Sequence, residues 1–138
     1  MSSTRVSAAL RRRVQERARG CCEYCLLSEE DAWLSHEPDH VIAEKHGGET
    51  TGENLAWACF DCNRHKGSDI ASRDSATGSL VPLFDPRSQS WRDHFELSEG
   101  RIFGLTAIGR VTERLLKFNL AERIEIRRLL IQVSRYPG

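Results

Sequence analysis

Four cysteines at the two ends of one stretch predict a metal site. Cys22 and Cys25 form one C-x-x-C pair, and Cys59 and Cys62 form a second. Each pair presents two sulfurs from a single turn, and two pairs fill the tetrahedral sphere that Zn²⁺ prefers. Because this set leaves no open position, we expect a structural zinc that contributes to folding. The fifth cysteine, Cys21, is expected to be a packing residue.

Between the cysteine pairs, and directly after the second pair, lie residue types that suit phosphodiester hydrolysis. Asp39 is a hard oxygen ligand for Mg²⁺ or Mn²⁺, and the amide oxygen of Asn63 could complete the ligand set of the same catalytic ion. His40 can take a proton from water near neutral pH. The amide of Asn54 could hold that imidazole in one tautomer or fix a loop. An ion would stabilise charge on the phosphate while the histidine activates water.

Basic side chains beside this set are candidates for contact with nucleic acid. Arg64 and Lys66 follow the last cysteine, and Lys66 is a candidate phosphate contact. His46 either contacts a phosphate or lies in a loop. The arginines of residues 11–19 are either a solvated helix face or a second phosphate-contacting face. The formal net charge of zero argues against a general nucleic-acid coat protein, but the distribution of charge leaves nucleic acid open as a partner.

The whole-chain properties limit size and location. A chain of 138 residues suffices for one domain with a modest core, or for a small module with an appendage. No apolar run is long enough to cross a membrane, and the first ten residues lack a long apolar segment with a cleavage site. We therefore expect a cytoplasmic location without membrane association. Cysteines in that setting favour metal binding over disulfides.

The elements around the cysteine pairs follow from periodicity and turn residues. Ser7 can cap a helix over residues 8–18. Residues 38–43 and 55–59 have the β-branched and apolar content of strands, and residues 62–67 suit a short helix. The predicted order is strand, loop, strand and helix, with a cysteine pair at each end.

The second half of the chain predicts a hairpin and two helices. Residues 95–98 and 101–105 read as the two strands of the hairpin. Thr106 can cap the first helix. Asn119 is expected to begin the second, with Glu122 three residues later completing a capping box.

Taken in order, these residues resemble the HNH endonuclease family, in its short free-standing bacterial form with four-cysteine zinc support. The resemblance covers about a third of the chain and rests on Cys22-x-x-Cys25, Asp39-His40-Val41-Ile42, His46-Gly47-Gly48, Asn54-Leu55 and Cys59-x-x-Cys62-Asn63-x-x-Lys66. It implies an α+β fold with a ββα-metal (His-Me finger) core. It also implies that His40 is the general base, Asn54 the central asparagine, and Asn63 the last position of the motif, where histidine often stands.

We therefore expect an HNH nuclease module over residues 5–70, with residues 71–138 packed on it as an extension. The boundary falls in residues 67–90, which are rich in Ser, Asp, Gly and Pro. The expected function is metal-dependent hydrolysis of DNA, with a double-stranded substrate. Two alternatives stay open: a non-catalytic zinc-dependent module that binds nucleic acid, and a protein-interaction module that uses the apolar faces of residues 106–133. Monomer and homodimer are both open.

Overall fold

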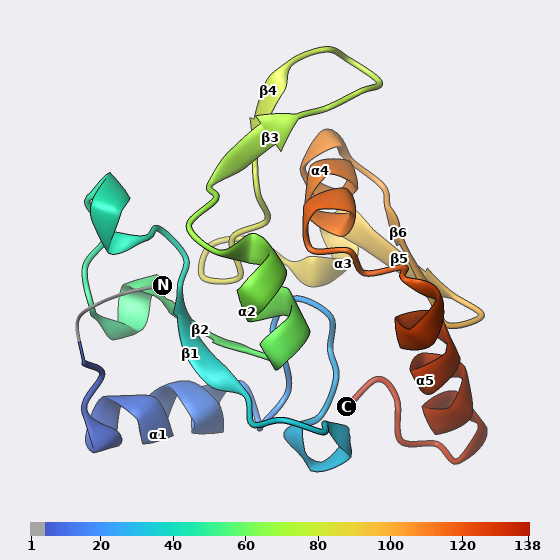
Figure 1. Cartoon of the computed structure of the whole chain (residues 1–138), viewed down its shortest axis with the longest axis horizontal. Helices are drawn as coiled ribbons and strands as arrows, with labels where there is room; N and C mark the ends of the chain where they lie inside the picture. Colours follow the sequence, from blue (N-terminus) through green and yellow to red (C-terminus); the bar gives the residue numbers. More distant parts are fainter. Residues whose placement is uncertain (1–4) are drawn as a thin grey trace.

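The computed structural model describes residues 5–138 and has an α+β fold with small antiparallel sheets (Figure 1). The α-helices in this range are α1 (Ala8–Arg17), α2 (Phe60–Lys66), α3 (Trp91–His94), α4 (Ala107–Leu115) and α5 (Ala121–Gln132). The strands are β1 (Glu37–His40), β2 (Leu55–Ala58), β3 (Ala71–Arg73), β4 (Leu80–Pro82), β5 (Phe95–Ser98) and β6 (Arg101–Gly104). They pair in sequence order as three two-stranded sheets.

The predicted strand, loop, strand and helix are confirmed as a ββα unit at the centre of Figure 1. β1 pairs with β2 in a register that places Asp39 opposite Ala56 and His40 opposite Leu55. β2 is buried along its whole length, as its apolar sequence predicts. α2 begins directly after Cys59, whose sulfur accepts a hydrogen bond from the backbone of Cys62 at the first turn. The helix therefore starts at the second cysteine pair.

Helix α1 lies against this unit and is held there by its arginines. Ser7 caps it as predicted, accepting a hydrogen bond from the backbone of Leu10. The guanidinium of Arg17 donates to two backbone carbonyls at the start of β2 and in the turn before it. Arg11 forms an ion pair with Glu37 at the start of β1. Part of the arginine run is thus structural.

The extension begins with a hairpin that the sequence did not predict. β3 and β4 pair across a loop in the Ser- and Gly-rich segment, at the top of Figure 1. Asp74 is buried beneath this loop, where it accepts hydrogen bonds from Thr77 and from the guanidinium of Arg110 on α4. These bonds lower the pKa of the Asp74 carboxyl below its ordinary value, with Arg110 as the largest cause.

The predicted second hairpin and first C-terminal helix are confirmed, and the predicted start of the second helix is wrong. Thr106 caps α4 by accepting a hydrogen bond from the backbone of Gly109. Asn119 does not cap α5, which starts at Ala121 without a side-chain cap. The Asn119 amide instead pairs with both the N–H and the C=O of Ile102 on β6. The amide oxygen that would accept the capping hydrogen bond is therefore used by β6.

The two halves of the chain share one hydrophobic core. The main cluster joins the buried cysteines to aromatic residues of the extension, including Phe84, Phe95 and Phe118. The chain end also returns to the first cysteine pair, because the backbone N–H of Gly138 donates to the carbonyl of Leu26. The extension is therefore packed on the ββα unit, and a boundary at residue 70 stays a prediction. In residues 5–138, no helix has the length and apolar character that crossing a membrane would require.

Candidate metal centre and active site

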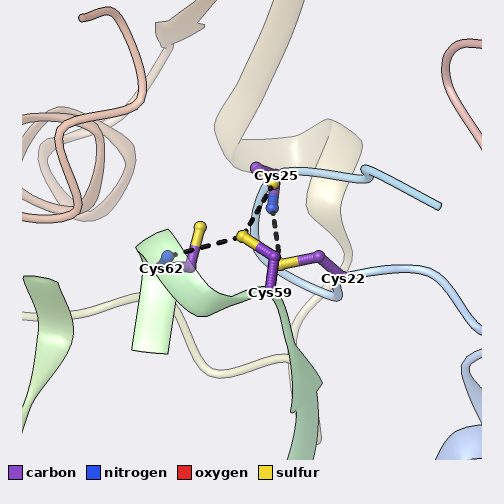
Figure 2. Close-up of side chains that lie close together, drawn as sticks. All are labelled: Cys22, Cys25, Cys59 and Cys62. Atoms are coloured by element: carbon purple, nitrogen blue, oxygen red, sulfur yellow. Dashed lines mark hydrogen bonds between the residues drawn. The ribbon is translucent and has the colours of Figure 1, made fainter. Parts of the chain in front are cut away.

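The fold brings the four predicted zinc ligands together in a buried cluster (Figure 2). The ligand atoms of Cys22, Cys25, Cys59 and Cys62 all lie within 4.8 Å of one another. Each pair also has an internal N–H···S bond of 3.4 Å, from the second cysteine to the sulfur of the first. Each bond fixes the sulfur of the first cysteine of its pair within the turn. Four buried sulfurs at this spacing fit a structural metal ion such as zinc.

Metal binding at this cluster is linked to protonation of its thiols. Burial raises the pKa of the Cys22 and Cys62 thiols above its ordinary value, whereas hydrogen bonds with the neighbouring cysteines lower the pKa of Cys25. Metal ions bind the thiolate form, so binding releases protons and weakens as the pH falls. Cys21 lies outside the cluster and is half-buried, consistent with the packing role expected for it.

Asp39 is buried, and one of its carboxylate oxygens is used by the fold. Oδ2 accepts a hydrogen bond of 2.8 Å from the hydroxyl of Tyr24 and lies 3.1 Å from the ammonium of Lys66. Oδ1 has no hydrogen-bonding partner among residues 5–138. Burial raises the pKa of Asp39, while the charge of Lys66 and the hydrogen bond from Tyr24 oppose that rise. A carboxylate fixed through one oxygen keeps the other for an incoming ion.

Lys66 corrects an expectation, because it is not a surface contact for phosphate. Its side chain is only 1% exposed. The ammonium points inward from α2, where it pairs with Asp39 and donates to the backbone carbonyl of His40 at 2.9 Å. Removing a lysine ammonium from water is costly unless its charge is paired and its N–H groups donate hydrogen bonds. Lys66 therefore fixes α2 to the end of β1.

Replacement of Lys66 by methionine should destabilise the fold by about 3–5 kcal/mol, because it leaves the buried Asp39 charge without its partner. The pKa of Asp39, already raised by burial, should rise further. The Asp39 carboxyl then binds a proton more tightly in the folded state than in the unfolded state. The loss of unfolding free energy should therefore become smaller as the pH falls through the raised pKa of Asp39. Urea unfolding at two pH values measures both effects. The exposed Lys45→Met variant is the control, and equal stability of the two variants would contradict the assignment.

His40 is bound by a residue that the sequence analysis did not single out. Its Nε2 lies 2.8 Å from the hydroxyl oxygen of Thr50, in the loop between β1 and β2. Its other ring nitrogen, Nδ1, has no partner in the part of the chain that the structure describes. If Nε2–H donates to Thr50, the lone pair is on Nδ1. The only signal for Thr50 was its place in a loop that returns to the strand carrying His40.

Asn54 does not contact the imidazole of His40, which corrects the direct positioning role expected for it. Its amide accepts from the backbone N–H of Ile42 and donates to the carbonyls of Ile42 and Glu49, all at 2.8–2.9 Å. Gly48 is required beside this amide, since a Cβ there would lie 1.7 Å from the carbonyl oxygen of Ile42. Asn54 thus closes the loop and acts on His40 only through the loop.

Asn63 lies on α2, half-buried, three residues before Lys66. Residues three apart share a helix face, and Lys66 fixes that face against β1. No hydrogen bond to the Asn63 amide is present within residues 5–138. Its role as an ion ligand with Asp39 stays a prediction.

The remaining candidates, Arg64 and His46, lie at the surface. Arg64 is exposed on α2, with its guanidinium 5.4 Å from the ring centre of Phe60. His46 is exposed in the 3₁₀ turn Glu44–His46 of the loop that carries Thr50. Both side chains are exposed, and their contact with nucleic acid stays a prediction.

The comparison with protein families gives a match to this same part of the chain. Residues 22–69 match the family model described as HNH endonuclease. The matched range starts at the first cysteine and includes the four-cysteine cluster and all the candidate catalytic residues. The chain therefore carries an HNH endonuclease domain, which indicates a nuclease-type function in general. No curated protein and no solved structure gives a significant match.

Proposed function

We propose that this protein is a metal-dependent endonuclease that hydrolyses phosphodiester bonds of double-stranded DNA. One observation carries the proposal: Asp39 and His40 are adjacent, and each uses one polar atom for the fold while the other has no partner among residues 5–138. Neither free atom is among the fully buried side-chain atoms that lack a partner in residues 5–138, so both are open to solvent and to an incoming ion or water. The HNH domain match supports the same conclusion.

The two free atoms have complementary tasks in this proposal. Asp39 Oδ1 and the amide oxygen of Asn63 would hold a Mg²⁺ or Mn²⁺ ion, which when bound would stabilise negative charge on the phosphate and the leaving oxygen. His40 Nδ1 takes a proton from the attacking water. Thr50 accepts the hydrogen bond from Nε2–H and so keeps the lone pair on Nδ1. Lys66 and Tyr24 hold Asp39 in place.

The structural metal has a separate task in the proposal. The four-cysteine cluster holds zinc and fixes the start of α2, whose capping sulfur belongs to Cys59. Arg64 and His46, both exposed, would contact phosphates of the duplex. Contacts of this kind fix the position of the duplex and carry no base information, so the proposal includes no sequence preference.

Replacement of Thr50 by valine should lower the nicking rate about fivefold, because a net hydrogen bond of about 1 kcal/mol then no longer orients the imidazole. Thr50→Ser keeps the hydroxyl and should restore most of the rate. The measurement is the rate of plasmid nicking at several pH values for both variants. A valine variant as fast as the serine variant would show that Thr50 does not position His40.

The proposal is tested with supercoiled plasmid and the zinc-loaded protein in Mg²⁺, Mn²⁺, Ni²⁺ or Zn²⁺. Nicked or linear DNA that forms only with an added ion supports an endonuclease. Retarded but intact plasmid would support the non-catalytic nucleic-acid-binding module instead. If the plasmid is neither cleaved nor retarded, the protein-interaction module is favoured. The exposed apolar residues Ile126 and Leu129 of α5 would then contact the partner.

A further inference from the structure

An arginine of the extension contacts the sulfurs of the metal cluster. Arg123, on α5, donates through its guanidinium to Cys62 Sγ at 3.1 Å, and the same nitrogen lies 3.9 Å from Cys59 Sγ. The side chain is buried, with 7% of its surface exposed. It reaches the second cysteine pair from 61 residues further along the chain. The contact therefore exists only in the folded protein.

The rest of the Arg123 side chain is fixed by the end of α4. Its second terminal nitrogen donates to the carbonyls of Leu116 at 2.7 Å and Lys117 at 3.0 Å. Its guanidinium also lies 5.8 Å from the ring centre of Phe118. A guanidinium held by two carbonyls and a ring has little freedom left, and it stays charged at any physiological pH. It presents a fixed positive charge to the sulfurs.

The cluster has an electrostatic need for this charge. Four thiolates around one divalent ion carry a net charge of about two negative units, and a buried charge is costly unless it is paired. At 3.1 Å, the guanidinium and the sulfur of Cys62 stabilise each other's charged form.

The extension also donates hydrogen bonds to the turn that carries the first cysteine pair. Three successive carbonyls of its turn accept hydrogen bonds from the second half of the chain. Tyr24 accepts from the indole of Trp91 at 2.8 Å, and Cys25 accepts from the hydroxyl of Tyr136 at 2.6 Å. Leu26 accepts from the backbone of Gly138 at 3.1 Å. Both pairs are therefore held by groups outside the HNH domain.

We propose that Arg123 supports the metal site as a cationic hydrogen-bond donor to the cysteine sulfurs and thereby slows release of the metal. The extension then serves metal retention, through Arg123 at the second pair and the three donors at the first. This inference depends on the cysteine cluster binding metal and is independent of nuclease activity. Partners outside the ligand set of a metal site typically change metal affinity about 10- to 100-fold when they are replaced.

Arg127 provides a matched control on the same helix. It is as buried as Arg123 and lies one turn later, but its guanidinium donates to the carbonyls of Gly100 and Phe118 and to the amide oxygen of Asn119. Its hydrogen bonds thus go to backbone and amide oxygens and none goes to a cysteine sulfur. Replacing Arg127 removes a buried, hydrogen-bonded arginine without removing a bond to the metal cluster.

The test is transfer of zinc from the full-length, zinc-loaded protein to a chromophoric chelator, followed by absorbance. Arg123→Met should release zinc about 10- to 100-fold faster than the unmodified protein. Arg123→Gln, which keeps a donor without the charge, should also release it faster and serves if the methionine variant fails to fold. Arg127→Met should stay within about threefold of the unmodified rate, even where thermal unfolding shows similar destabilisation. Circular dichroism before the assay confirms that each variant is folded.

Two results would overturn the inference. The first is a folded Arg123 variant that releases zinc at the unmodified rate. The second is equal acceleration by the Arg123 and Arg127 variants, which would show that global stability, and not the contact with sulfur, controls release.

Discussion

His40→Ala should nick supercoiled plasmid at least about 10²-fold more slowly than the unmodified protein, because general bases contribute about 10²- to 10⁴-fold to such rates. The imidazole is nearly buried and its Nε2 is bound to Thr50, so its replacement removes the proposed base together with one hydrogen bond to the loop. Zinc content and the circular dichroism spectrum should stay unchanged, since His40 is not among the cysteine ligands. Gel analysis of plasmid conversion over time measures the loss.

His46→Ala is the matched control for this prediction. His46 is a histidine of the same domain, exposed in the loop turn, with no place in the proposed chemistry at the bond being cut. Its replacement should change the rate by a small factor through weaker phosphate contact. Unchanged plasmid cleavage by His40→Ala would end the assignment of His40 as base.

Cys59→Ala should abolish stoichiometric zinc binding and with it the cooperative unfolding of the protein. Structural zinc sites have apparent binding free energies of about 10–16 kcal/mol, which is more than a small domain has to lose. Cys59 also caps α2 through its sulfur and lies in the core shared by both halves of the chain. The loss should therefore reach the extension as well as the ββα unit. Metal analysis and thermal unfolding measure it.

Cys21→Ala distinguishes loss of a ligand from loss of any cysteine. Cys21 is half-buried and lies next to the first pair in sequence, but its sulfur is not part of the cluster. This variant should keep its zinc and unfold near the temperature of the unmodified protein. A Cys59→Ala variant that behaves in the same way would contradict a structural metal at this cluster.

Much of the HNH half was predictable because its signals are local. Two short cysteine spacings define the metal cluster, and each pair forms within a single turn. Lys66, however, lies 26 residues from His40, whose carbonyl it binds, and Lys66 faces inward only because Asp39 is there to pair with it. Sequence spacing predicts that Lys66 lies on a short helix, but it does not show whether Lys66 is on the buried or the exposed face of that helix.

The extension was harder to predict, since its polar residues are used in contacts distant in sequence. Asn119 has the sequence context of a helix cap, yet both sides of its amide pair with β6. Arg123 and Arg127 are charged residues on a C-terminal helix, and periodicity cannot indicate that both are buried. Their partners are carbonyls and sulfurs at the ends of other elements, which become neighbours only in the folded chain.

We propose that one domain holds two metal sites with separate tasks, a structural zinc site and a site for a catalytic ion. The most direct measurement passes zinc-loaded protein through a chelating resin, determines bound zinc per chain, and follows plasmid nicking as Mg²⁺ or Mn²⁺ is added back. We expect about one zinc to stay bound, as a closed four-cysteine site requires, with nicking absent until the second ion is added. Full nicking without any added ion, at unchanged zinc content, would contradict a catalytic ion at Asp39 and Asn63.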